Sequence, residues 1–591
     1  MNMNARWLPV LVVLAMVDAA LAQGPGPGPG GRGGLGPGPG GRFGGPFRDT
    51  VQPEPEAGTA KITGRVVSAE TGTPIRRAQI RITSRDGRTN HEVMTDSDGR
   101  FEFLSLAAAG YRLYVAKAGY VTLEYGQARP FESGKTLDIT NGQTLEKIDF
   151  SLPRGSVIAG RITDEFGDAV TDAQVQAMRY QFTSGERRLV NVGRNSMTDD
   201  LGQFRIFGLM PGEYLVRASM RVNNSAAPAA GSDEGPTGYP GTYYPGVADV
   251  VQAQAVTVAL GQELTSVAFP LVPARLSRIS GTAMSSDGRP LGGAAVILRT
   301  PGSGIAGRVN VGGSNQVRPD GTFRLINVPP GDYVLDVQQR PQNIQNLQNL
   351  NIADLEFASV PISVAGDVDG IAVITAPGAT ASGRVVFQGQ PQNANLRSVQ
   401  ITATAPSGMP SIPAFAVRAL GGGRVNTDGT FALRGLAGPQ LIRAGGIPAG
   451  WAVKSITLDG TDITDAAFEF KPGATHTGLL VTLTDRITQL SGDVRDSRGQ
   501  ALSDYVIVVF AEDEKLWGAP SRHVATARPN QNGTFSITGL PPARYLAAAV
   551  PSLENGMQND SAVLARLRTR AESLTLAEGQ TLNVNLELML Q

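Results

Sequence analysis

One five-residue pattern recurs along this chain and limits its folding more than any other feature. The pattern is an apolar residue, any residue, glycine, any residue and an apolar residue. It occurs as ITGRV, IAGRI, ISGTA, ASGRV and LSGDV, centred on Gly64, Gly160, Gly281, Gly383 and Gly492. Successive copies are roughly 100 residues apart, which is the size of one ordinary domain. The repeat therefore predicts five similar domains in tandem.

A second pattern follows each copy and keeps a fixed internal length. It consists of Gly-x-Phe and, ten residues after the phenylalanine, a tyrosine, or a leucine in the fourth copy. The five pairs are Phe101 and Tyr111, Phe204 and Tyr214, Phe323 and Tyr333, Phe431 and Leu441, and Phe535 and Tyr545. The distance from the glycine pattern to the phenylalanine varies, whereas this spacing does not. The constant spacing predicts a rigid pair of alternating strands joined as a hairpin.

The turn that enters the phenylalanine strand reads TDSDGRFEF in the first copy and raises the alternative of a calcium loop. An EF-hand loop needs oxygen ligands at its first, third, fifth and twelfth positions, with glycine at the sixth. With Gly99 as the sixth residue, Asp96 and Asp98 fit, but the first position is Met94 and the twelfth is Ser105. The recurring Asp-Gly or Asn-Gly pair instead favours a tight turn with positive φ at the glycine.

Composition agrees with a chain of short strands and turns. The sequence holds 73 glycines and 39 prolines, more turn-forming residues than an average domain has. Helical patterns are scarce. The exception is 560–573, where Asp560 is a candidate N-cap and Leu564 and Leu567 share one face. The sequence therefore predicts an all-β protein with one short helix.

The N-terminus has the pattern of an export signal. Arg6 precedes the apolar run 7–17, and ALA at 20–22 is a small-x-small cleavage site, so we expect a signal peptide at 1–22. The apolar run is too short to span a bilayer, and no later segment approaches the ~20 residues required. Residues 23–58 are rich in Gly and Pro and predict a disordered tether.

The repeats also place the domain boundaries. Each repeat closes with a glycine-led strand pattern shortly before the next glycine pattern begins. Linkers are therefore expected to be short, as in a chain of beads with restricted bending. The expected domains are β-sandwiches at 59–153, 154–274, 275–378, 379–486 and 487–591, the last with the helix near 560–573.

The first repeat resembles a known family. Its segments ITGRV, TGTPIRRAQIRI, TDSDGRFEFLSL and GYRLYVAKAGY are similar to the carboxypeptidase regulatory-like domain. The later repeats follow the same order, the fourth least closely, so the resemblance covers roughly residues 60–591. It implies five tandem immunoglobulin-like or prealbumin-like β-sandwiches, a fold shared with starch-binding modules and transthyretin. Such domains accompany peptidases, receptors, adhesins and surface proteins, so the resemblance implies fold more than function.

Ionisable and nucleophilic residues give little support for catalysis. The chain has no cysteine, and His91, His476 and His523 lie in three different repeats without the spacing of a zinc site. No G-x-S-x-G motif occurs, and the acid pairs lie in predicted turns. We therefore expect no catalytic residues, no metal site and no cofactor. The chain has 52 acidic and 52 basic residues, a balance that argues against nucleic-acid binding.

Three aromatic clusters are candidate ligand surfaces. Tyr239, Tyr243 and Tyr244 lie in a Pro/Gly-rich insert, and Trp451 and Trp517 are the tryptophans that follow the export signal. Exposed rings of this kind bind sugars by stacking and lose little entropy on binding. The alternative is that these rings fill the ends of their own sandwiches.

The function expected from these observations is non-catalytic. We expect an exported protein of the periplasm, cell surface or extracellular space that binds an envelope or extracellular protein, or a matrix, through sheet edges. The alternative is a carbohydrate-binding protein that holds a polysaccharide on its exposed aromatic rings. Neither hypothesis includes nucleic acid, a cofactor or a transmembrane segment in the mature chain.

Overall fold

The computed structural model describes residues 58–85, 89–183, 185–220, 236–301, 309, 311–339, 355–389, 396–404, 406, 423–518 and 520–589. Every described element lies within residues 52–591. The expected signal peptide and all but the last residue of the expected tether lie outside the described residues. None of the described helices has the length and apolar character needed to cross a membrane.

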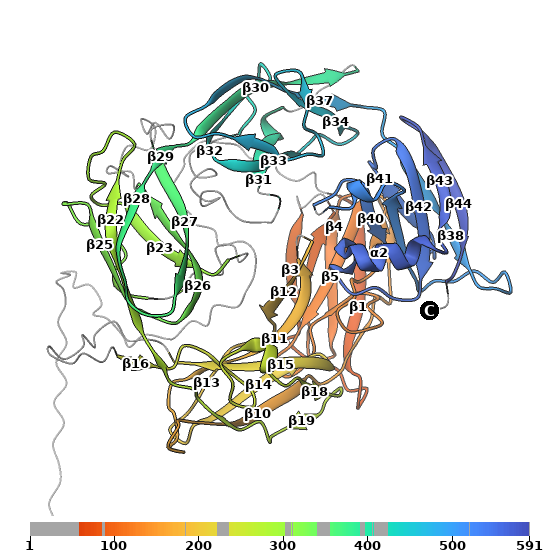
Figure 1. Ribbon diagram of the computed structural model, residues 1–591. Coiled ribbons are helices and arrows are strands. Elements are labelled where there is room, and N and C mark those ends of the chain that lie inside the picture. The colour runs from red at the N-terminus through yellow and green to blue at the C-terminus, as the bar shows by residue number, and fades with distance from the viewer. Residues whose placement is uncertain are drawn as a thin grey trace, which may run out of the picture. The chain divides into compact units, whose positions relative to one another are not determined.

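The described strands form pairs of sheets (Figure 1). Each pair encloses a hydrophobic core. In every pair, one sheet holds the strand of the repeated glycine and is called here the glycine sheet. The other holds the strand of the repeated tyrosine, or of Leu441, and is called the tyrosine sheet. We number the pairs sandwich 1 (Ala60–Leu152), sandwich 2 (Ser156–Arg275), sandwich 3 (Ser277–Pro377), sandwich 4 (Ala379–Thr484) and sandwich 5 (Gln489–Glu587). The predicted all-β fold class is confirmed, and the exact domain boundaries stay predictions.

The glycine sheets have the following strands in spatial order. Sandwich 1 has β4 (Arg100–Leu106), β1 (Ala60–Ser68) and β8 (Thr144–Leu145), with β9 (Phe150–Leu152) also on β1. Sandwich 2 has β14 (Gln203–Leu209), β10 (Ser156–Thr163) and β19 (Glu263–Leu264), with β20 (Phe269–Pro270) also on β10. Sandwich 3 has β24 (Gly312–Ser314), β25 (Thr322–Val328), β22 (Ser277–Met284) and β28 (Val368–Ile374). Sandwich 4 has β32 (Thr430–Leu436), β30 (Ala379–Gln388), β37 (Thr475–Thr484), β34 (Ala452–Leu458) and β35 (Thr461–Asp462). Sandwich 5 has β41 (Phe535–Thr538), β38 (Gln489–Arg495) and β44 (Thr581–Glu587).

The tyrosine sheets are listed in the same way. Sandwich 1 has β3 (Asn90–Met94), β2 (Gln79–Ser84), β5 (Ala109–Ala116) and β6 (Leu123–Glu124), with β7 (Leu137–Ile139) on β5. Sandwich 2 has β12 (Glu186–Asn191), β11 (Gln174–Thr183), β15 (Gly212–Ser219) and β17 (Thr242–Tyr243), with β13 (Ser196–Met197) on β11 and β18 (Val256–Val258) on β15. Sandwich 3 has β23 (Ala295–Arg299), β26 (Gly331–Gln338), β27 (Glu356–Val364) and β29 (Ala376–Pro377). Sandwich 4 has β31 (Gln400–Thr404), β33 (Gly438–Gly445) and β36 (Phe468–Phe470). Sandwich 5 has β40 (Val524–Ala527), β39 (Val506–Ala511), β42 (Ala543–Val550) and β43 (Glu572–Leu576). A separate ribbon pairs β16 (Thr237–Gly238) with β21 (Ala274–Arg275).

The repeated glycine lies between two neighbouring strands that leave no room for a side chain. It pairs across an antiparallel ladder with the repeated phenylalanine: Gly64 with Phe101, Gly160 with Phe204, Gly281 with Phe323, Gly383 with Phe431, and Gly492 with Phe535. The last strand or strands of the sandwich run parallel on the other side. A Cβ added at any of these glycines would lie 1.6 to 2.2 Å from a backbone carbonyl oxygen on that side. Only glycine permits this approach, which explains the recurring pattern.

The phenylalanine and tyrosine strands do not form the hairpin that the sequence predicts. In sandwich 1 they are β4 and β5, which belong to opposite sheets, and the other four sandwiches repeat this separation. The chain therefore crosses from one sheet to the other between these strands, and the hairpin prediction is wrong. The fixed spacing has a different cause, because the crossing must bring Phe101 and Tyr111 into the same core.

A hydrogen bond of the tyrosine closes the crossing in four of the five sandwiches. The hydroxyl group donates to the backbone carbonyl four residues earlier, from Tyr111 to Ala107 (2.9 Å), Tyr214 to Met210 (2.6 Å), Tyr333 to Pro329 (2.9 Å) and Tyr545 to Pro541 (2.7 Å). In sandwich 4, where Leu441 cannot donate, the side-chain amide of Gln440 donates to the carbonyl of Ala437 at 2.7 Å. Each crossing is thus tied to its own strand by a side chain.

Replacing Tyr214 by phenylalanine tests this bond. The ring still fills the core, but the carbonyl of Met210 loses its donor, so sandwich 2 should lose about 1 kcal/mol of local stability. Hydrogen exchange of β15 in the full-length protein should then be about fivefold faster. Tyr180→Phe, on the half-exposed outer side of β11, is the matched control. Equal effects of the two variants would show that the bond contributes nothing.

The turn before the phenylalanine strand has the predicted geometry. The Oδ1 atom of Asp96 accepts the backbone N–H groups of Asp98 (2.9 Å) and Arg100 (2.8 Å), as in an Asx-turn. Gly99 has a φ of 74°, and the equivalent glycines of the other four copies have φ values between 72° and 85°. The tight-turn interpretation is confirmed.

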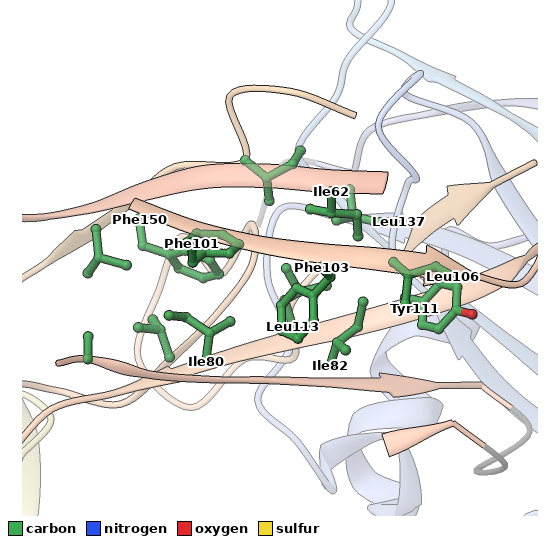
Figure 2. Close-up of a cluster of buried hydrophobic side chains, with 14 of the residues drawn as sticks. Ile62, Ile80, Ile82, Phe101, Phe103, Leu106, Tyr111, Leu113, Leu137 and Phe150 are labelled. Atoms are coloured by element: carbon green, nitrogen blue, oxygen red, sulfur yellow. The ribbon is translucent and has the colours of Figure 1, made fainter. Parts of the chain in front are cut away.

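Figure 2 shows how the two layers of sandwich 1 share one core. Ile62, Phe101 and Phe103 come from the glycine sheet. Ile80 and Leu113 face them from the tyrosine sheet. All five side chains are buried, and their neighbours along the strands are more exposed. Alternation of this kind is what the sequence predicts for strands with one buried face.

The predicted helix is present in sandwich 5 but is shorter than expected. It is α2 (Ser561–Arg568), and the Oδ1 atom of Asp560 accepts the N–H of Ala562 at 2.9 Å, which confirms the N-cap. Leu564 is fully buried in a second core against the outer side of β39 and β42. The helix ends early because β43 already begins at Glu572. The described 3₁₀ helices are η1 (Val250–Gln252), η5 (Leu396–Ser398), η6 (Glu514–Leu516) and η7 (Met557–Asn559).

Candidate interaction surfaces

The tyrosine-rich insert of sandwich 2 is bound tightly to its own sheet. Thr242 is fully buried, and its hydroxyl accepts the N–H of Val272 at 2.8 Å. The backbone N–H of Tyr244 donates to the carbonyl of Val216 on β15 at 2.9 Å. The ring of Tyr244 is partly buried and meets Phe269 edge-on at 5.9 Å between centroids. Tyr244 therefore belongs to the margin of the core.

The other two tyrosines of the insert are half-buried and engage charged groups. The hydroxyl of Tyr239 donates to the carboxylate of Glu165. Burial and this carboxylate together raise the pKa of Tyr239 to about 12. Burial also raises the pKa of Tyr243, although the charge of Arg217 opposes the shift. These two rings keep part of their surface exposed, as the sequence-based interpretation requires.

The two tryptophans pack inside their own sandwiches. Trp451 is partly buried and meets Phe387 edge-on at 4.5 Å between ring centroids in sandwich 4. Trp517 is 5% exposed, and its indole N–H donates to the carbonyl of Ala511 at 2.7 Å. Its ring lies in the second core of sandwich 5, edge-on to Phe510. This burial favours the alternative that Trp517 fills its own sandwich.

The candidate aromatic residues therefore belong to three separate sandwiches and are not gathered into one site. The sequence left open whether they bind a ligand or fill the sandwiches. Trp517 is buried within its own sandwich, and Tyr244 and Trp451 are partly buried against the cores of theirs.

A charged cluster joins sandwich 4 to sandwich 5. Both carboxylate oxygens of Asp465 accept from Arg522, each at 2.9 Å, and Oδ2 also lies 3.2 Å from Nε2 of His523. Burial alone would raise the pKa of Asp465. The hydrogen bonds and charges of Arg522 and His523 outweigh burial, so this pKa lies well below the usual range. Arg522 and His523 follow Asp465 in the chain by 57 and 58 positions, so the cluster joins distant segments.

Acid should weaken this junction. Because the pKa of Asp465 is lowered on folding, its contribution is complete above the unfolded carboxyl pKa, near ~4, and is lost as pH falls further. We expect the melting temperature of the full-length protein to fall between about pH 5 and pH 2, and Asp465→Asn to remove part of that dependence. Glu213→Gln, at an exposed position, should leave the pH profile unchanged. An unchanged profile in Asp465→Asn would contradict the assignment.

A second charged contact joins sandwich 1 to sandwich 5, which are the first and last in the chain. An Nη1 atom of Arg528 lies 2.9 Å from Oε2 of Glu132, and the two side chains are 4% and 2% exposed. The same guanidinium also pairs with Asp504 and donates to the carbonyl of Ser133. Within the described residues, Oε1 of Glu132 and Nε of Arg528 have no hydrogen-bond partner. The pair is thus deeply buried but not fully satisfied.

The neighbouring residue Phe131 extends this contact to sandwich 2. The guanidinium of Arg179 lies over the ring of Phe131, 3.8 Å from its centroid. The same guanidinium pairs with Glu554 of sandwich 5 at 2.7 Å, and the N–H of Asn555 donates to the carbonyl of Phe131 at 3.0 Å. Residues of three sandwiches therefore share one polar junction, beyond the neighbour contacts expected of beads on a chain.

The histidines occupy three unrelated environments. His91 lies on the exposed strand β3, and His476 contacts Asp459 and the rings of Phe468 and Phe470. Both ring nitrogens of His523 are engaged, one by Asp465 and the other by the Tyr545 hydroxyl at 3.2 Å. Over the described part of the chain, no three His, Asp or Glu residues converge as a metal site would require.

The acid-rich stretch 458–465, which ends at Asp465, is expected from the sequence to be a solvated loop. Sequence reasoning did not identify Glu132, Arg522 or Arg528. Each is a lone charged residue between strands, and neither its spacing nor its neighbours distinguish it from a solvated loop residue. The signal that could have found them is the pairing of distant segments, which requires the folded chain.

Comparison with known proteins identifies the first repeat. Residues 61–153 match the family model of the carboxypeptidase regulatory-like domain, which confirms the resemblance for this segment. No curated protein matches the chain.

Solved structures with partial similarity include proteins of different kinds. The TIE protein of Bacillus anthracis is 12% identical, over 73% of this chain and 74% of that chain, with a TM-score of 0.15. The minor pilin of Streptococcus agalactiae is 14% identical, over 36% of this chain and 97% of that chain, with a TM-score of 0.20. The 3-chlorocatechol 1,2-dioxygenase of Rhodococcus opacus is 18% identical, over 12% and 42%, with a TM-score of 0.10. Values this low assign neither a family nor a function to the whole chain.

Proposed function

We propose that this protein, whose first repeat matches a carboxypeptidase regulatory-like domain, is an exported, non-catalytic interaction protein. In this proposal it acts in the cell envelope or extracellular space and holds a protein or matrix partner. Export rests on the signal-peptide pattern at 1–22. The five predicted domains would act as one scaffold that presents sheet edges and loops to the partner.

The observation that carries this proposal is a pair of charged contacts between sandwiches, one buried and one partly buried. Glu132 with Arg528, and Asp465 with Arg522, connect one sandwich to another. Burying charged groups costs free energy, which such contacts offset only when their geometry is good. Groups used in this way hold the sandwiches to each other. A scaffold of docked domains can contact a partner at several points, which strengthens binding without any single tight site.

The test uses the mature full-length protein as bait in the native envelope and extracellular fractions, together with a turnover panel. We expect capture of a defined protein or matrix component that also binds when purified, and no turnover of peptide or ester substrates. A heat-denatured bait is the control for nonspecific capture. Turnover by the purified protein would overturn the proposal, as would the absence of any partner that binds in purified form.

Carbohydrate binding is the second candidate, and one arrangement in sandwich 2 favours it. The hydroxyl of the half-buried Tyr239 donates a hydrogen bond to the carboxylate of Glu165. Phe166, which follows Glu165 in the chain, is 82% exposed. An aromatic face beside a carboxylate is a combination that suits a sugar ring. A glycan array with the wild-type protein, Phe166→Ala and Tyr239→Phe would decide. If the wild-type protein binds a sugar and either substitution abolishes that binding, carbohydrate binding becomes the favoured function.

A further inference from the structure

The last strand of the glycine sheet in sandwich 3 has an open edge. This strand is β28, seven residues long, and it pairs with β22 on one side. Among the described residues, no strand pairs with its other side. The N–H of Thr375 donates to the carbonyl of Met284 on β22 at 2.9 Å, so the peptide groups of Thr375 point inward. By alternation along the strand, those of Ala372 and Ile374 point outward.

Sandwich 4 shows what the corresponding edge can hold. There the last strand is β37, and β34 pairs with its outer side in antiparallel orientation. In β34, Ile456 lies opposite Val481 of β37, and Leu458 lies opposite Leu479. Both β34 side chains are 1% exposed. A strand with aliphatic residues two positions apart thus extends both the sheet and the core. The chain itself supplies this strand in sandwich 4.

Sandwiches 2 and 5 protect this edge by residue type, sandwich 4 covers it with β34, and sandwich 1 has a polar serine there. The position three residues after the repeated glycine pairs with Ser151 in sandwich 1, Pro270 in sandwich 2, Ile374 in sandwich 3, Thr482 in sandwich 4 and Glu587 in sandwich 5. Proline and charged residues are the usual protection of a sheet edge against further pairing. Thr482 is covered by β34. Sandwich 3 alone among these five has an aliphatic side chain at the position.

The open edge is also apolar on its outer face. Ile374 is 70% exposed, and its cross-strand partner Met284 is 40% exposed. Directly opposed residues in neighbouring strands point to the same face. On the inner face, Val373 is buried, whereas Ile371, which occupies the place of Leu479 in sandwich 4, is only partly buried. Both faces would lose exposed apolar surface if a strand were added here.

We propose that the outer edge of β28 binds an extended segment of a partner protein by strand addition. The segment runs antiparallel to β28 and places aliphatic residues two positions apart opposite Ile371 and Val373, as Ile456 and Leu458 do in sandwich 4. Outward peptide groups of β28 supply the main-chain hydrogen bonds, and the aliphatic positions supply the selectivity. This inference rests on the proposed function and names the chemistry of its partner.

The test uses a peptide that matches residues 451–460 of this chain, WAVKSITLDG, labelled with a fluorophore. We expect saturable binding to the full-length protein by fluorescence anisotropy, and at least tenfold weaker binding to Ile374→Lys, because an edge lysine opposes pairing. Glu587→Lys, at the matching position of sandwich 5, should bind as the wild type does. A peptide N-methylated at alternate residues, which cannot form the ladder, should not bind.

Other outcomes would overturn the inference. Equal binding to wild type and Ile374→Lys would place the peptide elsewhere, and an absence of binding would leave the edge without this role. A halving of the solution mass by Ile374→Lys would assign the edge to a second copy of the chain. Hydrogen exchange of β22 in Ile374→Lys serves as the folding check. If partner capture persists in Ile374→Lys, the proposed function stands while this inference fails.

Discussion

Replacing Gly281 by alanine should open sandwich 3 locally and cost about 3 kcal/mol of its stability. The added Cβ would lie 2.2 Å from the carbonyl oxygen of Ile371 and 2.7 Å from the ring of Phe323. Both neighbours are held in strands that pair with β22, so neither can move without breaking a ladder. We expect hydrogen exchange of β22 and β28 in the full-length protein to be about a hundredfold faster.

The matched control for this variant is Gly366→Ala, in the same sandwich. A Cβ at Gly366 meets no atom within 4 Å, and its φ does not lie in the left-handed region. Exchange in β22 and β28 should therefore be close to that of the wild type. If Gly281→Ala behaves like Gly366→Ala, crowding by the last strand does not explain the repeated glycine.

Removing the carboxylate of Glu132 should weaken the contact between sandwich 1 and sandwich 5 by about 3 kcal/mol. Glu132→Ala leaves the guanidinium of Arg528 buried with one charge partner fewer, and an uncompensated buried charge is strongly destabilising. The remaining partner, Asp504, is half-exposed and compensates less. We expect hydrogen exchange in 124–135 and 528–532 to be about a hundredfold faster, with β22 of sandwich 3 unaffected.

The control for Glu132 is an ion pair on the surface. Lys61 and Glu102 form such a pair, with side chains 39% and 45% exposed, and Lys61→Ala should change local stability by less than ~1 kcal/mol. A second variant, Glu132→Gln, keeps the shape and one acceptor atom and should fall between the two. An effect of Glu132→Ala as small as that of Lys61→Ala would show that the junction does not hold the two sandwiches together.

Residues whose roles depend on nearby chain could be predicted from the sequence. The positive φ of Gly99 follows from the Asp-Gly pair, and the N-cap of α2 follows from Asp560 before an apolar pattern. The buried faces of β4 and β5 follow from alternation. The repeat also pointed to Gly64 and its equivalents, although not to the reason for them.

The errors concern which strands become neighbours. The constant spacing from Phe101 to Tyr111 was compatible with a hairpin and with a crossing between sheets, and only the structure shows the crossing. The sequence likewise left open whether Trp517 is exposed or buried, and its burial depends on α2 packing against the outer side of its sheet. Sequence patterns record which face of a strand is buried but not which element covers that face.

The sequence by itself determined the all-β class, the fivefold repeat, the turns and the helix cap. These follow from the backbone preferences of glycine, aspartate and asparagine and from the alternation of apolar residues, which act over a few residues. Only the tertiary structure decided the crowding at Gly281, the pairing of Glu132 with Arg528, and the open edge of β28. Each of these depends on segments far apart in the chain that meet only when the sandwiches have folded.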